Sequence, residues 1–274
     1  MSLAKPIFPQ LNKSLEISKG IVFAAPLADG SVNFVKDVSG NKLHGVPTGT
    51  PTIVRDTYGY AINSVGDGEN INFGQNKRIV FTDDTNDKPF TVYTRVKFNS
   101  ITGTTVVSSK DGASSSREWN VLVHNAGKIS MNSLDTRTGT YWIGRETGTS
   151  LISAGVWYGI TVTYTGSGTS AGYKIYINEA RKDSANFEGT PGSYVAMRDL
   201  GNDFTIGVKD GLIQGPDSAY SNAVLWNREI TAREVALLHA DPFAMYRKRQ
   251  YGVAKAPEAT GPPVGSLSMS GVGR

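Results

Sequence analysis

The chain has 274 residues, 39% of them hydrophobic and 19% charged, which is enough to bury a core in one large β domain or two small ones. It has no cysteine, which excludes disulfides, thiolate chemistry and cysteine zinc sites, and no apolar run approaches the ~18 residues of a membrane span. Residues 246–274 hold five basic side chains and one acid, so residues 1–245 carry no net charge. We therefore expect neither nucleic-acid nor membrane partners.

Short segments with alternating apolar residues follow one another along most of the chain. In FTVYTRVKF (90–98), Phe90, Val92, Val96 and Phe98 lie on one side and polar residues on the other, which predicts a strand with one buried face. Similar segments span residues 20–27, 104–109, 118–124, 128–134, 157–166, 173–178 and 203–208. Turn-forming clusters separate them, so we expect a two-sheet antiparallel sandwich in one domain.

One helix is predicted, near the end of this β domain. Thr231-Ala-Arg-Glu234 has the spacing of a capping box and precedes Val235 and Leu238, and Asp241-Pro242 ends the pattern. A helix of ~9 residues is too short to be stable alone, so its apolar side should pack against a sheet.

Four stretches within residues 19–246 carry a family resemblance. GIVFAAPLADGSVNFVKDVSGNKLHGV, FTVYTRVKF, SAGVWYGITVTYTG with YKIYINEARKD, and AVLWNREITAREVALLHADPF occur in the order typical of one group. Together they resemble the laminin-G-like, concanavalin A-like (pentraxin-type) jelly-roll domains found in tailed-bacteriophage virion proteins. The resemblance implies an all-β jelly roll that hosts lectins, hydrolases and structural modules alike. Relatives carry an Asp-Glu pair where this chain has Ser221-Asn222, which removes two possible calcium ligands.

The acidic residues do not follow the pattern of the glucanases in this group. Those enzymes place two or three carboxylates on one face of a strand, and no strand here has that pattern. Asp83, Asp84 and Asp87 lie in the turn-like TDDTNDKP, which we interpret as a solvated loop. The three histidines are scattered without the spacing of metal ligands. We expect no enzymatic activity and no catalytic residue.

Two groups of residues are candidates for binding. Tyr141 and Trp142, with Arg137 and Arg145 in DTRTGTYWIGRE, combine the aromatic and planar polar side chains that hold sugars. The alternative is a cross-strand aromatic pair that covers the sandwich.

Calcium is the other candidate ligand. Asp37, Ser39 and Asn41 could supply oxygen ligands to a structural calcium ion, although an Asx turn explains the same residues. No other cofactor is expected.

Both terminal segments have compositions that cannot fold alone. Residues 1–18 contain isolated apolar residues and prolines, and residues 255–274 contain ten Gly, Pro or Ser. Such segments become ordered on neighbouring molecules, so we interpret 1–18 and 247–274 as arms on either side of a sandwich at 19–246. The basic residues of the second arm are candidates for attachment: Arg247, Lys248, Arg249 and Lys255.

These observations favour a non-enzymatic virion protein of a tailed phage, made in the host cytoplasm. We expect a head decoration protein, homo-oligomeric in the assembly, attached by its arms to the major capsid protein or to neighbouring copies. A carbohydrate-binding module of a tail or fibre, with host-surface glycans as ligands, is the alternative. A polysaccharide hydrolase or lyase is the third hypothesis.

Overall fold

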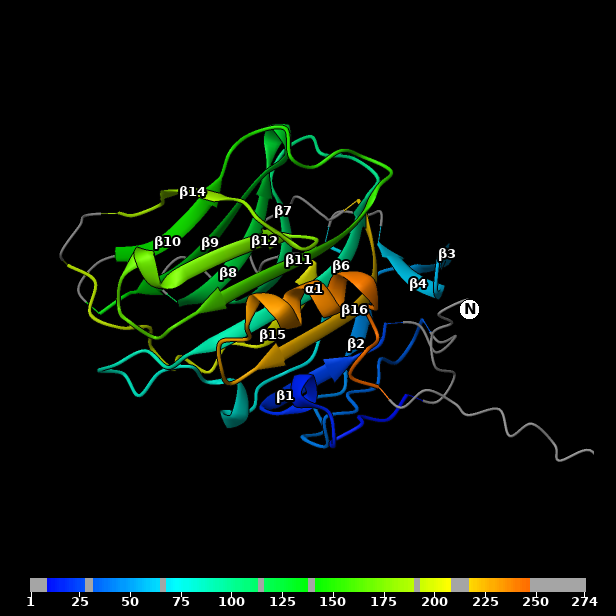
Figure 1. The fold of residues 1–274 in the computed structure, drawn as a ribbon, viewed down its shortest axis with the longest axis horizontal. Coiled ribbons are helices and arrows are strands. Elements are labelled where there is room, and N and C mark those ends of the chain that lie inside the picture. Colours follow the sequence, from blue (N-terminus) through cyan, green and yellow to red (C-terminus); the bar gives the residue numbers. More distant parts are fainter. Residues whose placement is uncertain are drawn as a thin grey trace, which may run out of the picture.

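The structure, a computed structural model, describes residues 9–27, 32–64, 68–112, 116–137, 141–189, 193–207 and 217–246. These residues form two antiparallel sheets of eight strands that pack face to face (Figure 1). Sheet 1 has the order β13 (Ala180–Arg181), β12 (Tyr173–Ile177), β11 (Trp157–Tyr164), β6 (Phe90–Phe98), β16 (Ser218–Trp226), β4 (Gly59–Ser64), β3 (Thr52–Asp56), and β1 (Ile21–Ala25) also pairs with β16. Sheet 2 has the order β14 (Asp183–Asn186), β10 (Tyr141–Thr147), β9 (Lys128–Asp135), β8 (Arg117–His124), β7 (Thr105–Asp111), β15 (Phe204–Gly207), β5 (Asn70–Asn72), β2 (Val46–Thr48). The predicted jelly-roll sandwich is confirmed.

Helices contribute little to the described residues. Short 3-10 helices occur at η1 (Glu16–Ser18), η2 (Lys77–Ile79), η3 (Asn125–Gly127) and η4 (Ser170–Gly172). The predicted helix is α1 (Ala232–Ala240), and its capping box is formed: the Glu234 amide donates to the Thr231 hydroxyl at 3.3 Å, and the Thr231 amide donates to Glu234 Oε2 at 2.8 Å. No helix in the described ranges is long and apolar enough to cross a membrane.

The core between the sheets is rich in stacked aromatic rings. Phe90 on β6 stacks on Phe81 with ring centroids 4.5 Å apart, and Trp119 on β8 lies 5.9 Å from both Phe90 and Phe204. These side chains come from both sheets and are almost completely buried. The inward-facing half of each predicted strand therefore does supply the core that its alternation predicted.

A second apolar cluster covers the outer face of sheet 1. Figure 1 shows α1 lying across this sheet over β16, and the residues after the helix fold back beside it. The cluster is formed by the following buried residues: Leu11, Ile17, Ala24, Tyr93, Tyr176, Val224, Trp226, Ile230, Val235, Leu238, Phe243, Met245 and Tyr246. A short helix is stable here because its apolar side is buried against a sheet.

Part of the expected N-terminal arm belongs to this cluster instead of extending away. Leu11 pairs with Tyr246 in an isolated bridge, and Ile17 accepts a hydrogen bond on its carbonyl from the Trp226 indole at 2.7 Å. The apolar side chains of Leu11 and Ile17 are both buried, and their burial favours this packing. The C-terminal arm, with Arg247, Lys248, Arg249 and Lys255, lies outside the described residues, as do residues 1–8.

Ser221 and Asn222, where relatives have acids, lie at a bulge in β16. The Asn222 amide donates to the Pro242 carbonyl at 2.6 Å, and its oxygen accepts from the Tyr246 hydroxyl at 2.8 Å. Asn222 thus ties the segment after α1 to sheet 1. A carboxylate could not donate to Pro242 in this way.

The interpretation of residues 83–87 as a solvated loop is wrong for Asp87. Its Oδ2 accepts hydrogen bonds from Tyr164 at 2.8 Å and Tyr194 at 2.7 Å, and its Oδ1 accepts from the Met197 amide at 2.8 Å. Burial raises the pKa of the Asp87 carboxyl above its usual range. The carboxyl is a structural tie because three donors satisfy it inside the fold.

Candidate functional site

A row of small polar residues crosses the outer face of sheet 2. Directly opposed residues in an antiparallel sheet point to the same face, and their neighbours along each strand point into the core. The pairings link six residues across β5, β15, β7, β8, β9 and β10, which we call the polar row: Asn72, Thr205, Ser109, Asn120, Asn132 and Gly144. α1 covers the outer face of sheet 1 and does not lie over this face (Figure 1).

Hydrogen bonds run along the polar row. Asn132 Nδ2 donates to Asn120 Oδ1 at 2.9 Å, and Asn120 Nδ2 donates to Asp111 Oδ2 at 2.7 Å. The Ser109 and Thr205 hydroxyls lie 3.0 Å apart. The first two bonds fix the orientation of the Asn120 and Asn132 side-chain amides, so their polar atoms are already oriented before a ligand binds.

The row ends at Gly144 with an acceptor and a donor that the protein does not use. Asn132 is 6% exposed, and its Oδ1 has no hydrogen-bond partner in the described part of the chain. A Cβ at Gly144 would lie 1.9 Å from the Met131 carbonyl oxygen and 3.1 Å from Asn132 Oδ1, so β10 approaches β9 here at a distance that only glycine allows. Trp142, two residues before Gly144 on the same face, has a buried indole Nε1 that is also without a partner. A buried polar atom left unpaired costs about 1–3 kcal/mol, which a ligand that pairs with it recovers.

Aromatic rings stand beside this end of the row. The rings of Trp142 and Phe187 lie 6.3 Å apart, and His124 lies 6.3 Å from Phe187 on the other side. The His124 imidazole is 2.7 Å from the Ser130 hydroxyl, and burial, followed by the nearby Lys128, lowers its pKa below the usual range. A lowered pKa favours the neutral imidazole, so this wall is apolar and uncharged near neutral pH.

The four residues proposed from sequence for glycan binding do not form one cluster. Tyr141 and Trp142 are consecutive on β10 and therefore point to opposite faces. Arg145 donates to Asp183 from Nε at 3.2 Å and from Nη2 at 2.8 Å, and to Asn186 at 2.8 Å. Of the candidates, Trp142 alone lies beside the end of the polar row.

Arg137 and Trp142 are both partly enclosed by the chain. Arg137 pairs with Asp135 at 3.4 Å and donates to the Asp84 carbonyl. The backbone of Gly189 lies against the Trp142 indole, because a Cβ there would be 2.3 Å from the ring. The indole therefore offers its Nε1 edge and its remaining surface instead of two open faces.

The proposed calcium ligands form a tight turn. Asp37 Oδ1 accepts from the amides of Ala24 and Ser39, and Oδ2 accepts from the Ser39 hydroxyl and the Leu43 amide, all within 3.1 Å. Asn41 Nδ2 donates to the Val22 carbonyl at 2.7 Å. This is the Asx-type turn that the sequence left open, and a cation bound by Asp37 would have to displace these donors. Within the described ranges no group of three or more His, Asp or Glu could hold a metal.

Sequence reasoning missed Asn120 and Asn132. Both alternate with buried apolar residues, in EWNVLVH and KISMNSL, so an outward polar position was visible in each strand. Their alignment across the sheet depends on the register of β8 and β9, which the strands alone do not reveal.

Comparisons with known proteins agree with this architecture. Residues 65–236, more than half of the chain, match the laminin-G-type model of the concanavalin A-like lectin/glucanases superfamily. No curated protein matches the chain in sequence. Among solved structures, the binding domain of Paraclostridial mosquitocidal protein 1 is similar, with 17% identity, a TM-score of 0.62, and coverage of 82% of this chain and 52% of that one.

Two botulinum neurotoxin structures are similar as well. One is the binding domain of neurotoxin DC in complex with SialylT, with 15% identity, a TM-score of 0.56, and coverage of 82% of this chain and 52% of that one. The other is the receptor binding domain of neurotoxin D, with 13% identity, a TM-score of 0.57, and coverage of 82% and 53%. The chain spans about half the length of these structures, and at these identities the likeness concerns the fold. On its family match and its sandwich topology, the chain belongs to the concanavalin A-like lectin/glucanases superfamily.

Proposed function

We propose that this chain is a lectin-like binding module that holds a saccharide at the Gly144 end of the polar row. The observation that carries the proposal is the pair of unused buried atoms, Asn132 Oδ1 and Trp142 Nε1, beside a position without a side chain. A sugar hydroxyl donates and accepts at once, so one hydroxyl or two neighbouring ones can satisfy both atoms. The Trp142 and Phe187 rings supply the apolar surface on which sugar C–H groups pack.

The fold neighbours support binding over catalysis. They are binding domains, one of them in complex with SialylT, and this chain spans about half of each. The likeness is one of fold, so the ligand of this chain is argued from its own residues.

The acids on this face support the same choice. Glu146 on β10 and Asp111 on β7 are three strand spacings, or about 14 Å, apart across the sheet and are also offset along the strands, whereas glycosidases hold their two carboxyl groups about 5–10 Å apart. Glu118, on the strand next to Asp111, is paired with Lys110 Nζ at 2.6 Å. Asp203, next to β15, lies on the other neighbouring strand, and its Oδ2 accepts from Asn72 at 2.9 Å. A hydrolase that used this outer face would have Asp111 and Asp203, on neighbouring strands, as its nearest pair of acids. Asp111→Asn and Asp203→Asn are therefore the variants that would expose one, if purified protein released reducing ends from polysaccharides.

The biological setting we propose is the surface of a tailed-phage virion. The Gly, Pro and Ser content of residues 255–274 and the basic residues after 246 suit an arm that becomes ordered on the capsid or on neighbouring copies. In a head decoration protein, such attachment leaves the sandwich displayed outward. A tail or fibre location serves the same binding function.

A glycan array tests the binding proposal. Wild-type protein should bind a subset of neutral glycans, and Asn132→Ala combined with Trp142→Phe should reduce that binding at least tenfold, since it removes both unused atoms while keeping a ring. Asn72→Ala is the matched control, at the far end of the polar row. Unchanged binding by the double variant, or equal loss in the control, would place the ligand elsewhere.

A further inference from the structure

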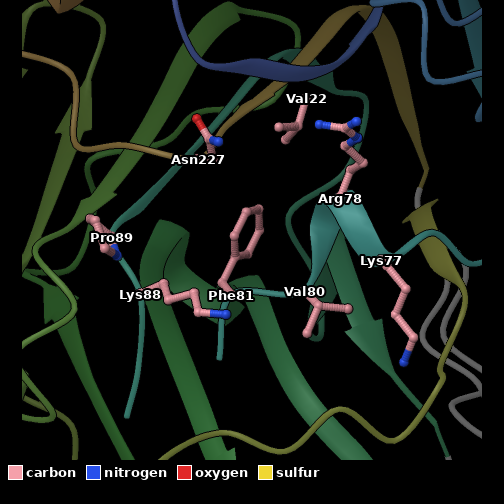
Figure 2. A pocket seen from close by; sticks show the side chains of 8 residues that line it. All are labelled: Val22, Lys77, Arg78, Val80, Phe81, Lys88, Pro89 and Asn227. Atoms are coloured by element: carbon pink, nitrogen blue, oxygen red, sulfur yellow. The ribbon is translucent and has the colours of Figure 1, made fainter. Parts of the chain in front are cut away.

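A cavity of about 520 Å³ opens at one end of the sandwich, away from the polar row. Val22 comes from the start of β1, and Asn227 follows the end of β16. The other walls come from η2, the segment after it, and the residues just before β6. Its walls are formed by eight residues: Val22, Lys77, Arg78, Val80, Phe81, Lys88, Pro89 and Asn227. Figure 2 shows Phe81 among these side chains, with Lys88 and Pro89 on one side and Arg78 on the other. The volume suits a small ligand.

Local hydrogen bonds hold the rim of the cavity in place. The Asn76 side chain accepts from the Arg78 amide at 2.9 Å and donates to the Asn41 carbonyl at 3.1 Å, which fixes the start of η2. On the opposite rim the Asn227 amide donates to the Gly20 carbonyl at 2.9 Å. The backbone that carries Arg78 and Asn227 is therefore set by the fold before a ligand binds.

The charge of the cavity is positive and only partly compensated. Its lining contains three cations and no carboxylate. Lys77 is hydrogen-bonded to Asp199, and Lys88 donates to the neutral Thr82 carbonyl at 2.9 Å. Arg78 is exposed and its guanidinium has no partner in the described part of the chain. Arg78 therefore leaves a positive charge for a ligand to pair with, and Lys88, which also interacts with Asp83, adds to the positive charge of the lining.

The floor of the cavity is apolar. Phe81 is buried against Phe90, with its ring stacked at an interplanar angle of 4°, and Val22, Val80 and Pro89 surround it. A strongly hydrated inorganic anion gains little from such a surface. An anionic group attached to a ring with C–H faces gains from both the cations and the floor.

A neighbouring cavity is less suited to an anion. It has a volume of about 460 Å³ and shares Lys77 and Val80 with the first, but Asp199 forms part of its wall. Its other cation, Lys110, is buried in an ion pair with Glu118 at 2.6 Å. The anion therefore belongs in the cavity of Arg78, and the second cavity gives room for the next unit of a chain.

We propose that the cavity around Phe81 binds a carboxylate-bearing sugar unit of an acidic polysaccharide. The carboxylate pairs with the Arg78 guanidinium, Lys88 adds positive charge on the other side of Phe81, Asn227 faces the ring hydroxyls, and the apolar floor contacts one ring face. This site lies apart from the polar row and goes beyond the proposed function, because it selects charge where the polar row selects hydroxyl groups.

Calorimetric titration with tetragalacturonate and with its fully methyl-esterified form tests this assignment, since esterification removes the charge and leaves the sugar rings and their hydroxyl groups in place. We expect the acid to bind at least tenfold more tightly than the ester. Arg78→Gln should weaken binding of the acid about tenfold or more, and Arg78→Lys should recover part of the loss because it restores the charge without the planar fork. Arg233→Gln, an exposed arginine on α1, is the matched control and should bind like wild type.

The Asn132→Ala, Trp142→Phe variant separates the two sites, and it should bind tetragalacturonate normally even if it loses a neutral glycan. No binding of the acid by wild-type protein, equal binding of the ester, or full affinity in Arg78→Gln would each overturn the proposal. Sodium sulfate that displaced tetragalacturonate at equal concentration would also overturn it, since the apolar floor would then contribute nothing.

Discussion

The outer faces of the two sheets differ in what the chain places on them. Sheet 1 carries apolar side chains there and covers them with α1, the segment after it and residues from the N-terminal side. Sheet 2 carries a hydrogen-bonded row of Asn, Ser and Thr that ends in two unused polar atoms. The first face is closed by the chain itself and serves stability. The second face keeps polar atoms that can pair with a ligand, as a binding site requires.

The largest expected difference between the two faces is in their tryptophans. Trp226→Ala removes a fully buried side chain and the hydrogen bond to Ile17, and should lower the free energy of unfolding by about 3–5 kcal/mol. Trp142→Ala, on sheet 2, should cost less than half as much because Trp142 is only partly buried and its Nε1 has no partner in the described part of the chain. Urea unfolding measures both, and equal losses would mean that the outer face of sheet 2 is a second core.

The two terminal segments should likewise differ in how much their deletion lowers the stability of the fold. Deleting residues 1–18 removes Leu11 and Ile17 from the cluster on sheet 1 and should lower the free energy of unfolding by about 3 kcal/mol. Deleting residues 250–274 should leave the melting temperature unchanged and abolish incorporation into the particle, as judged by co-sedimentation. Full occupancy of the particle after the second deletion would contradict the proposed arm.

Two asparagines provide a matched comparison. Asn222→Ala leaves the Pro242 carbonyl and the Tyr246 hydroxyl unpaired inside the fold, so it should cost about 1–3 kcal/mol. Asn132→Ala leaves one buried acceptor, Asn120 Oδ1, unpaired but also removes an oxygen that is already unpaired, so it should cost about 1 kcal/mol or less. Thermal melts of the two variants rank them, and the reverse order would contradict the different roles of the two faces.

The smallest effect concerns the cap of α1 and its pH dependence. Burial opposes ionisation of Glu234, but hydrogen bonds from Arg228 and Thr231 outweigh it and lower its pKa below 4.5. The ionised Glu234 carboxylate therefore stabilises the fold above pH 4.5, and this contribution is lost as the pH falls through the pKa of Glu234 in the folded state. Glu234→Ala should lower the free energy of unfolding by about 1 kcal/mol at neutral pH, and this free energy should then fall less steeply as the pH is lowered. Glu16→Ala, an exposed acid, is the control and should leave both unchanged.

Much of the sandwich followed from period-two patterns, and the exceptions have physical causes. β6 and β11 are predicted well because each alternates over eight or nine residues. β2 and β5 are three residues long, and β3 lies at a sheet edge with no buried residue, so neither alternation nor burial marks them in the sequence. The helix was predicted because its cap and its stop are local.

The candidate site was predicted in part. Trp142 was identified by its type, whereas Tyr141 was grouped with it although consecutive strand residues face opposite ways. Arg145 was taken as a ligand residue, but Asp183 is 38 positions away and nothing local predicts their ion pair. Asn132 matters through its register with Gly144, and register is a property of the folded sheet.

The most direct test of the central claim is chemical-shift mapping of isotope-labelled protein with a neutral glycan that it binds. The account predicts that the signals of the Asn132 side-chain amide, the Trp142 indole N–H and the Gly144 amide shift together and saturate at one Kd, while those of α1 and Asn222 stay in place. Shifts confined to the α1 side of sheet 1, with Asn132 and Trp142 unmoved, would contradict it.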